Sequence, residues 1–219
     1  AAFGSGAGPI QLDDLECNGD EANLLACPDV VPGENNCSHL EDVGVTCIVD
    51  DVEAGGVFFS EYVEGSSFNK AVEIYNGVGE AIDLNTCAVH IFANGNAEPS
   101  SRITLGDGPL NLAAGATYVL CNTRSDAPLL ERCDQTTGSV SFNGDDAVAL
   151  VCDDAIVDVI GQIGFDPGSA WEGGGLSTAD RTLRRQCDIT DGDAAGDDAF
   201  DPSEEWDGFD RNTFDGIGA

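Results

Sequence analysis

The cysteines of this chain of 219 residues constrain its fold more than any other feature of the sequence. There are 9 of them: four, at positions 17, 27, 37 and 47, fall within the first fifty residues, and the others run from Cys87 to Cys187. No pair has CxxC spacing, and the histidines His39 and His90 lie too far apart to complete a zinc site. We therefore expect disulfides, which persist in oxidising compartments, and an extracellular protein, secreted or at the cell surface.

The charge balance is strongly acidic. The chain has 41 Asp and Glu residues against 8 Lys and Arg, a formal net charge of -33, and Lys70 is its only lysine. Nucleic acid and anionic membranes are bound through basic surfaces, so we expect neither as a partner. An acidic surface attracts cations, but it also suits solubility in salty surroundings, and both interpretations remain open.

The sequence contains neither a signal peptide nor an apolar run long enough to span a bilayer. We therefore expect a mature product or a fragment, with no membrane insertion.

The composition and the hydrophobic pattern of the sequence change along the chain. Residues 1–49 are rich in Gly, Asp and Asn with little periodicity, which is typical of a small module stapled by disulfides. An acidic and then glycine-rich stretch at 50–56 is the expected linker. From Val57 to the end, eight short β-rich runs, among them VFFSEYVEG, KAVEIYNG, SVSFNG and AVALVC, alternate with turn residues and predict an all-β sandwich over 57–219. The expected fold class is mainly β.

The segment beyond Cys187 is polar and acidic, yet it carries Phe200, Trp206, Phe209 and Phe214. These aromatic residues predict a segment that packs back on the sandwich instead of a disordered tail. The run 191–197 has alternating oxygen donors and a glycine in sixth place, as calcium loops do, but the twelfth position is a proline where such loops carry a bidentate Glu. An acidic connector is the preferred interpretation.

Residues 3–47 combine GxGPIxLDD before Cys17, GxExxLxxC ending at Cys27, and CSHxEDxGVxC from Cys37 to Cys47. Together they resemble the C-terminal half of a scavenger-receptor cysteine-rich domain, which implies a local Cys17–Cys27 disulfide. In that family the partners of Cys37 and Cys47 belong to an upstream half. Three alternatives stay open: that half lies outside this sequence, a cleaved chain remains attached by disulfides, or the two residues pair with each other.

Many members of that family bind proteins, glycans or microbial surfaces through a calcium site. The resemblance implies calcium ligands at Asp13, Asn36 and Glu41, with further ligands upstream, and such oxygen donors are the ones that calcium prefers. Alternatively, Asp13 and Glu41 satisfy backbone amides in tight turns. Asn36 also begins a weak N-x-S glycosylation sequon, so a glycan there competes with the metal.

The rest of the chain carries the motifs FSEYVEGSSFNKAVEIYN, LAAGATYVLCN, FNGDDAVALVC and STADRTLRR. They resemble a lamin-tail domain of the secreted type, which implies an immunoglobulin-like β-sandwich. Cys121 and Cys133 bracket a short loop and are the expected disulfide of this domain. Cys87, Cys152 and Cys187 leave one cysteine over, and their pairing stays open.

Several charged groups in this part invite a chemical interpretation. They are the acids and lysine at Glu61, Glu64, Lys70 and Glu73, the turn residues Asp145 and Asp146, and the arginines Arg181, Arg184 and Arg185. Paired carboxylates beside a lysine can tune one another for acid–base work, and an arginine cluster can bind phosphate. We favour structural roles instead: strand-edge acids, a surface ion pair of Lys70, backbone hydrogen bonds in the turn, and arginines that neutralise neighbouring acids.

No nucleophile motif, phosphate-binding loop or multi-histidine metal set occurs in the sequence. We expect a non-enzymatic interaction or structural protein that binds proteins or glycans at a cell surface or in matrix, with calcium as cofactor and self-association as an option. One alternative is a subunit of an extracellular filament, wall or surface appendage, linked through exposed strands or unpaired cysteines. The other is the accessory region of a secreted hydrolase.

Overall fold

The structure is a computed structural model. The chain forms two compact units, Ala1–Asp50 and Asp51–Ala219. It describes residues 55–106 and 110–218, together with Ile10, Leu12, Cys27, Val31, Gly33, Asn35, Asn36 and Ser38. In the first unit Cys27 is buried and disulfide-bonded, and the Asn35 side-chain amide donates to the Ile10 carbonyl oxygen at 3.1 Å.

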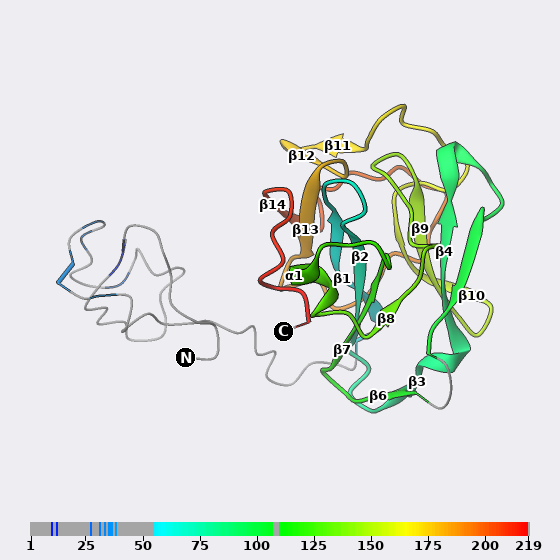
Figure 1. Ribbon diagram of the computed structural model, residues 1–219, viewed down its shortest axis with the longest axis horizontal. Coiled ribbons are helices and arrows are strands. Elements are labelled where there is room, and N and C mark those ends of the chain that lie inside the picture. Colours follow the sequence, from blue (N-terminus) through cyan, green and yellow to red (C-terminus); the bar gives the residue numbers. More distant parts are fainter. Residues whose placement is uncertain are drawn as a thin grey trace. The chain divides into compact units, whose positions relative to one another are not determined.

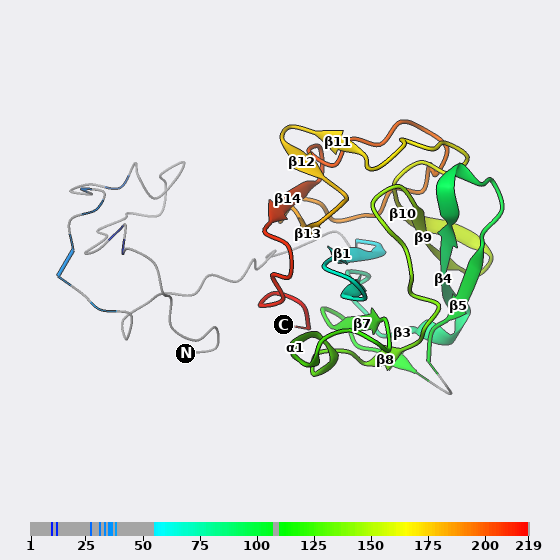
Figure 2. The ribbon, with the colours of Figure 1, turned by 45° about the horizontal axis from the view of Figure 1, so that its top comes forward.

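The second unit is a sandwich of two mainly antiparallel sheets, which lie on opposite sides of the core in Figures 1 and 2. The larger sheet, in the order β14-β13-β1-β2-β7-β8, consists of β1 (Val57–Glu64), β2 (Lys70–Asn76), β7 (Thr117–Cys121), β8 (Gln135–Thr136), β13 (Arg181–Arg185) and β14 (Trp206–Phe209). The smaller sheet, in the order β10-β9-β4-β5, consists of β4 (Cys87–Phe92), β5 (Ser101–Thr104), β9 (Ala147–Cys152) and β10 (Ala155–Ile160). The predicted mainly β fold class is confirmed.

Short elements complete the described part of the sandwich. Two short antiparallel pairs are β3 (Ile82–Asp83) with β6 (Asn111–Leu112) and β11 (Glu172–Gly173) with β12 (Leu176–Ser177). The helical elements are α1 (Ala127–Leu130) and the 3-10 turns η2 (Leu84–Thr86) and η3 (Ala93–Gly95). No helix among the residues that the structure describes is long and apolar enough to cross a membrane.

Seven of the eight predicted β-rich runs form strands, and the SVSFNG run does not. Val140 and Phe142 in this run are nonetheless almost fully buried. The backbone here is fixed by side-chain contacts instead of a strand partner, since Asn122 Nδ2 donates to the Val140 carbonyl oxygen at 2.5 Å. The apolar residues of the run therefore predicted burial correctly and strand pairing wrongly.

A β-bulge in β1 decides which side chains face the core. The register of β1 against β2 shifts between Phe59 and Glu61, so Phe59 and Tyr62 both belong to the core between the sheets although they are three residues apart. Glu61 and Val63 then face the opposite side of the sheet, where Val63 joins an apolar cluster with Val119 and others. The bulge thus places a carboxylate on a face that the C-terminal segment covers.

The C-terminal aromatic residues pack back on the sandwich, as predicted. Trp206 lies in β14 and is 1% exposed. Phe200 meets Trp171 edge to face, with ring centroids 6.1 Å apart, and Phe214 packs against the outer cluster of the larger sheet. The segment after β14 runs beside β13 towards α1 (Figure 1, red).

Two disulfides staple the described part of this unit. Cys87 and Cys152 face each other in neighbouring strands β4 and β9, and Cys121 at the end of β7 is bonded to Cys133. Cys187 is disulfide-bonded as well. None of the five cysteines of the sandwich is therefore a free thiol.

The last two residues of the expected linker hydrogen-bond to the sandwich. Gly55 N donates to the Gly77 carbonyl oxygen at 2.9 Å, and Gly56 N donates to that of Thr190 at 3.0 Å. A side chain at Gly55 would meet the Thr190 carbonyl oxygen at 2.4 Å, which explains why glycine stands there. The chain is thus fixed to the sandwich two residues before β1 begins.

Candidate functional site

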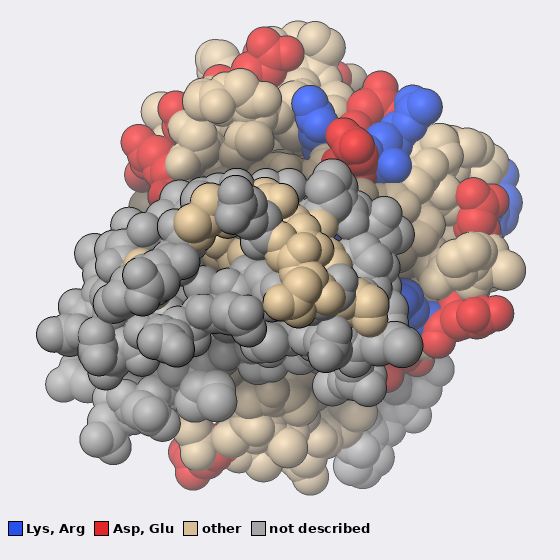
Figure 3. Space-filling model, turned by 90° about the vertical axis from the view of Figure 1, so that its left-hand side faces the viewer, with Lys and Arg blue, Asp and Glu red and all other residues tan. Residues whose placement is uncertain are grey.

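All eight basic side chains of the protein lie in the sandwich, and each is engaged in an internal contact. Lys70 pairs with Glu64, Arg102 with Glu98, Arg181 with Asp210, Arg184 with Glu61 and Asp215, Arg185 with Asp158 and Glu205, and Arg211 with Asp180, while Arg124 stacks on the Phe68 ring and Arg132 donates to the Ile217 carbonyl oxygen. Figure 3 shows basic and acidic side chains gathered side by side on one face. The arginines of β13 neutralise neighbouring acids, as expected, and the unpaired acids dominate the remaining charge.

The most deeply buried charges are Arg185 and Asp158, with side chains 2% and 0% exposed. Asp158 in β10 accepts backbone hydrogen bonds from Phe59 at 2.7 Å and Asp193 at 2.8 Å, besides its contact with Arg185. Burial raises the pKa of Asp158, and the charge of Arg185 opposes that rise. Because β10 and β13 belong to different sheets, this pair ties the two layers of the sandwich together.

A second buried cluster, which contains two carboxylates, lies on the outer face of the larger sheet. Glu61 and Glu73 face each other across β1 and β2, and both are buried. Arg184 Nε donates to Glu61 Oε2 at 3.0 Å, and the backbone N–H of Gly218 donates to Glu73. Burial raises the pKa of Glu61 to about 8, and it also raises the pKa of Glu73.

Glu61 keeps one buried oxygen, Oε1, without a hydrogen-bond partner. A side chain at Gly216 would come within 2.5 Å of Arg184 Nε and 2.7 Å of Glu61 Oε2. The C-terminal segment thus covers these acids closely and depends on glycine to do so.

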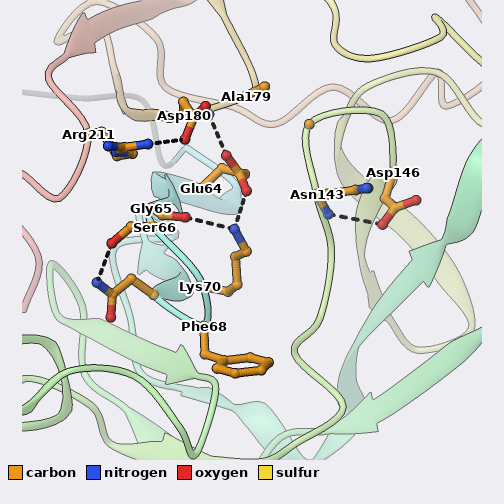
Figure 4. A network of polar contacts seen from close by, with 12 residues as sticks. Glu64, Gly65, Ser66, Phe68, Lys70, Asn143, Asp146, Ala179, Asp180 and Arg211 are labelled. Carbon is orange, nitrogen blue, oxygen red and sulfur yellow. Dashed lines mark hydrogen bonds and ion pairs between the residues drawn. The ribbon is translucent and has the colours of Figure 1, made fainter.

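The third cluster closes one end of the inter-sheet core (Figure 4). Glu64 and Lys70 pair directly, with side chains 9% and 10% exposed, so the prediction of a surface pair was wrong. The reason is register: β1 and β2 place the two residues opposite each other at the end of their inner faces. Lys70 Nζ also donates to the Gly65 carbonyl oxygen at 2.8 Å, and the backbone N–H of Asp180 donates to Glu64 Oε2.

The turn acids Asp145 and Asp146 lie in the same region. Asp146 accepts backbone hydrogen bonds from Asn94 at 2.9 Å and Asn143 at 3.0 Å, as its predicted turn role requires. Burial raises the pKa of Asp146. Asp145 is buried with its Oδ1 lacking a partner. Burial first, and then the charges of Glu64 and the two turn acids, raise the pKa of the core residue Tyr62 well above its usual value.

The residues expected to bind calcium are only partly described. Asp13 and Glu41 lie outside the described residues, as does Cys17, the expected partner of Cys27, and Asn36 is exposed. In the calcium-like run, Asp193 Oδ1 accepts from the Ala195 backbone at 2.8 Å, a turn contact. Over the described ranges, no group of three or more His, Cys, Asp or Glu side chains is placed to hold a metal ion.

The sequence did not single out Asp158 or Glu205. The one available signal was an aspartate flanked by apolar residues in the IVDVI run of β10, a pattern that an ordinary half-exposed strand also shows. Nor did the sequence reveal that Glu61 and Glu73 are buried, because residues far along the chain cover them.

Comparison with protein-family models finds two matches. Residues 52–164, just over half of the chain, match the model described as Lamin Tail Domain. Residues 1–48 match the model described as Scavenger receptor cysteine-rich domain. The identity and order of the two predicted segments are therefore confirmed. No solved structure was found to match the chain.

Proposed function

Because the chain belongs to the lamin tail domain family and carries a scavenger receptor cysteine-rich segment before it, we propose that it is an extracellular, non-enzymatic module that binds its partners with the help of cations. Both kinds of domain are interaction modules. The partners are proteins or glycans at a cell surface or in matrix.

One observation carries this proposal: in a protein with a formal net charge of -33, every basic side chain contacts another group of the same chain. A partner therefore meets a surface whose uncompensated charges are carboxylates. Such a surface binds basic groups directly, and it binds neutral or acidic ones through bridging divalent cations. Calcium is the proposed cation, held by Asp13, Asn36 and Glu41 in the first segment.

The sandwich serves as a rigid scaffold in this proposal. Among its buried carboxylates, Glu61, Glu64, Glu73, Asp146 and Asp158 contact basic side chains or backbone N–H groups, and Asp158 does so between the two sheets. Disulfides within the smaller sheet and beside the larger one add covalent restraint. These contacts support a role in positioning a binding surface and give no support to the alternative of a hydrolase accessory region.

The test is calcium binding by titration calorimetry on the full chain, with light scattering in calcium and in chelator. We expect saturable binding that Asp13→Asn combined with Glu41→Gln abolishes, and that Asp191→Asn, a matched change in the sandwich, leaves intact. Absence of binding, or equal binding by both variants, would contradict the calcium site.

The same light-scattering measurement distinguishes the proposed binding module from the alternative of a filament subunit. Growth in size that reducing agent reverses would favour disulfide-linked subunits, although the five sandwich cysteines are already bonded. Growth that chelator alone reverses would favour contacts bridged by cations.

A further inference from the structure

The pair formed by Lys70 and Glu64 has features that an ordinary ion pair does not need. Lys70 is the only lysine of the chain, and both side chains are about nine-tenths buried, at 10% and 9% exposure. Glu64 ends β1 and Lys70 begins β2, directly opposite in register. The backbone therefore holds the amine nitrogen against the carboxyl group without help from solvent.

On its core side the pair is followed along β1 by the buried ring of Tyr62. Tyr62, two residues before Glu64 and on the same face of β1, is fully buried and stacks on Phe142 with ring centroids 5.0 Å apart. Two separated charges at such a place carry the cost of losing their water. A neutral product of the same two groups would not carry this desolvation cost.

Two backbone groups match that neutral product. The Gly65 carbonyl oxygen accepts from Lys70 Nζ at 2.8 Å, and the Asp180 N–H donates to Glu64 Oε2, while Glu64 Oε1 is the oxygen that contacts Lys70. An amide needs one acceptor for its N–H and one donor for its carbonyl oxygen. Figure 4 shows both already in place around the pair.

We propose that Lys70 and Glu64 condense to an isopeptide bond between Nζ and Cδ. A proton passes from the ammonium to the carboxylate, the free amine attacks Cδ, and the bond from Cδ to Oε1 breaks. Oε1 leaves as water with two of the three ammonium protons, so charge and atoms balance without any other reactant. The remaining N–H donates to the Gly65 carbonyl oxygen, and Oε2 still accepts from the Asp180 N–H.

Fixed geometry is what makes this reaction feasible. Two groups held in contact react as if one were present at effective concentrations of about 10⁵–10⁸ M when their orientation is correct. The opposed register, the burial and the two backbone contacts supply that orientation. The product fastens the end of β1 to the start of β2 and locks the turn between them.

The test uses the full chain, reduced and denatured, in two measurements. Intact mass should be one water lighter than the sequence requires, and a lysine-specific protease should leave the chain uncut because its single lysine is acylated. Lys70→Arg should show the full sequence mass. Arg102→Lys, at an exposed position paired only with exposed Glu98, should be cut once and so verify the protease.

Full mass together with cleavage at Lys70 would overturn the proposal. So would a missing water with cleavage at Lys70, since that places the loss elsewhere, such as a cyclised Asp-Gly site. The wild-type chain alone decides the question if the Lys70→Arg variant fails to fold.

Discussion

Replacing Arg185 by methionine is the sharpest test of how the two sheets are held together. The change keeps a long side chain over the Trp206 ring, which the guanidinium carbon now approaches to 4.1 Å from the centroid, but it removes the charge. Asp158, 0% exposed, then retains only its backbone donors. Removing one partner of a buried ion pair costs about 3–5 kcal/mol, and we expect a loss of that size in the free energy of unfolding.

Arg181→Met is the matched control on the same strand. Arg181 is 39% exposed and contacts Asp210, which is 98% exposed, at 3.5 Å. Exposed pairs of this kind contribute less than about 1 kcal/mol, so the control should unfold almost as the wild type does.

The assay is urea unfolding followed by tryptophan fluorescence. Both tryptophans of the chain, Trp171 and Trp206, are buried in the sandwich, so the signal reports this unit alone. Urea is uncharged and leaves the ionic strength of a highly acidic protein unchanged. Equal midpoints for the two variants would refute the reasoning, and adding Asp158→Asn to Arg185→Met should recover part of the loss.

Three further predictions concern disulfides, pH and salt. Removing the Cys87–Cys152 disulfide, with a sequence separation of 65, should destabilise the sandwich by about 4 kcal/mol, against about 3 kcal/mol for Cys121–Cys133 with a separation of 12, as urea midpoints would show. The folded-state pKa of Glu61 is about 8 against an ordinary 4.5, so the folded protein holds a proton that the unfolded chain has lost between those values. Stability should therefore fall as the pH rises from about 4.5 to about 8, and Glu61→Gln should flatten that slope, whereas an unchanged slope would contradict it. Added sodium chloride should raise the melting temperature, because it screens repulsion within a chain of formal net charge -33, and a flat or falling melting temperature would count against this.

The sequence predicts the architecture well where the signal is local. The β-rich runs at β1, β2, β9 and β10 became strands. Trp206 in an acidic segment correctly indicated a segment that packs back on the sandwich. Each of these signals rests on neighbours within a few residues.

The buried charges could not be predicted, because their burial depends on strand register and on residues far away in the sequence. Glu61 is buried because a bulge near Ser60 turns it to the outer face and because residues around Gly216 cover that face. Neither cause is visible in the FSEYVEG motif. Lys70 likewise looked like a surface residue until the register placed it against Glu64 inside the end of the core.

The attachment of the chain ahead of β1 has a mechanical consequence. β1 is a central strand, hydrogen-bonded on one side to β2 and on the other to β13. A lengthwise pull on a central strand loads its lateral bonds together, whereas a pull that peels an edge strand breaks them one at a time. Gly55 and Gly56 set two more bonds in front of β1. Tension that reaches the sandwich through Gly55 therefore falls on the strand best placed to resist it.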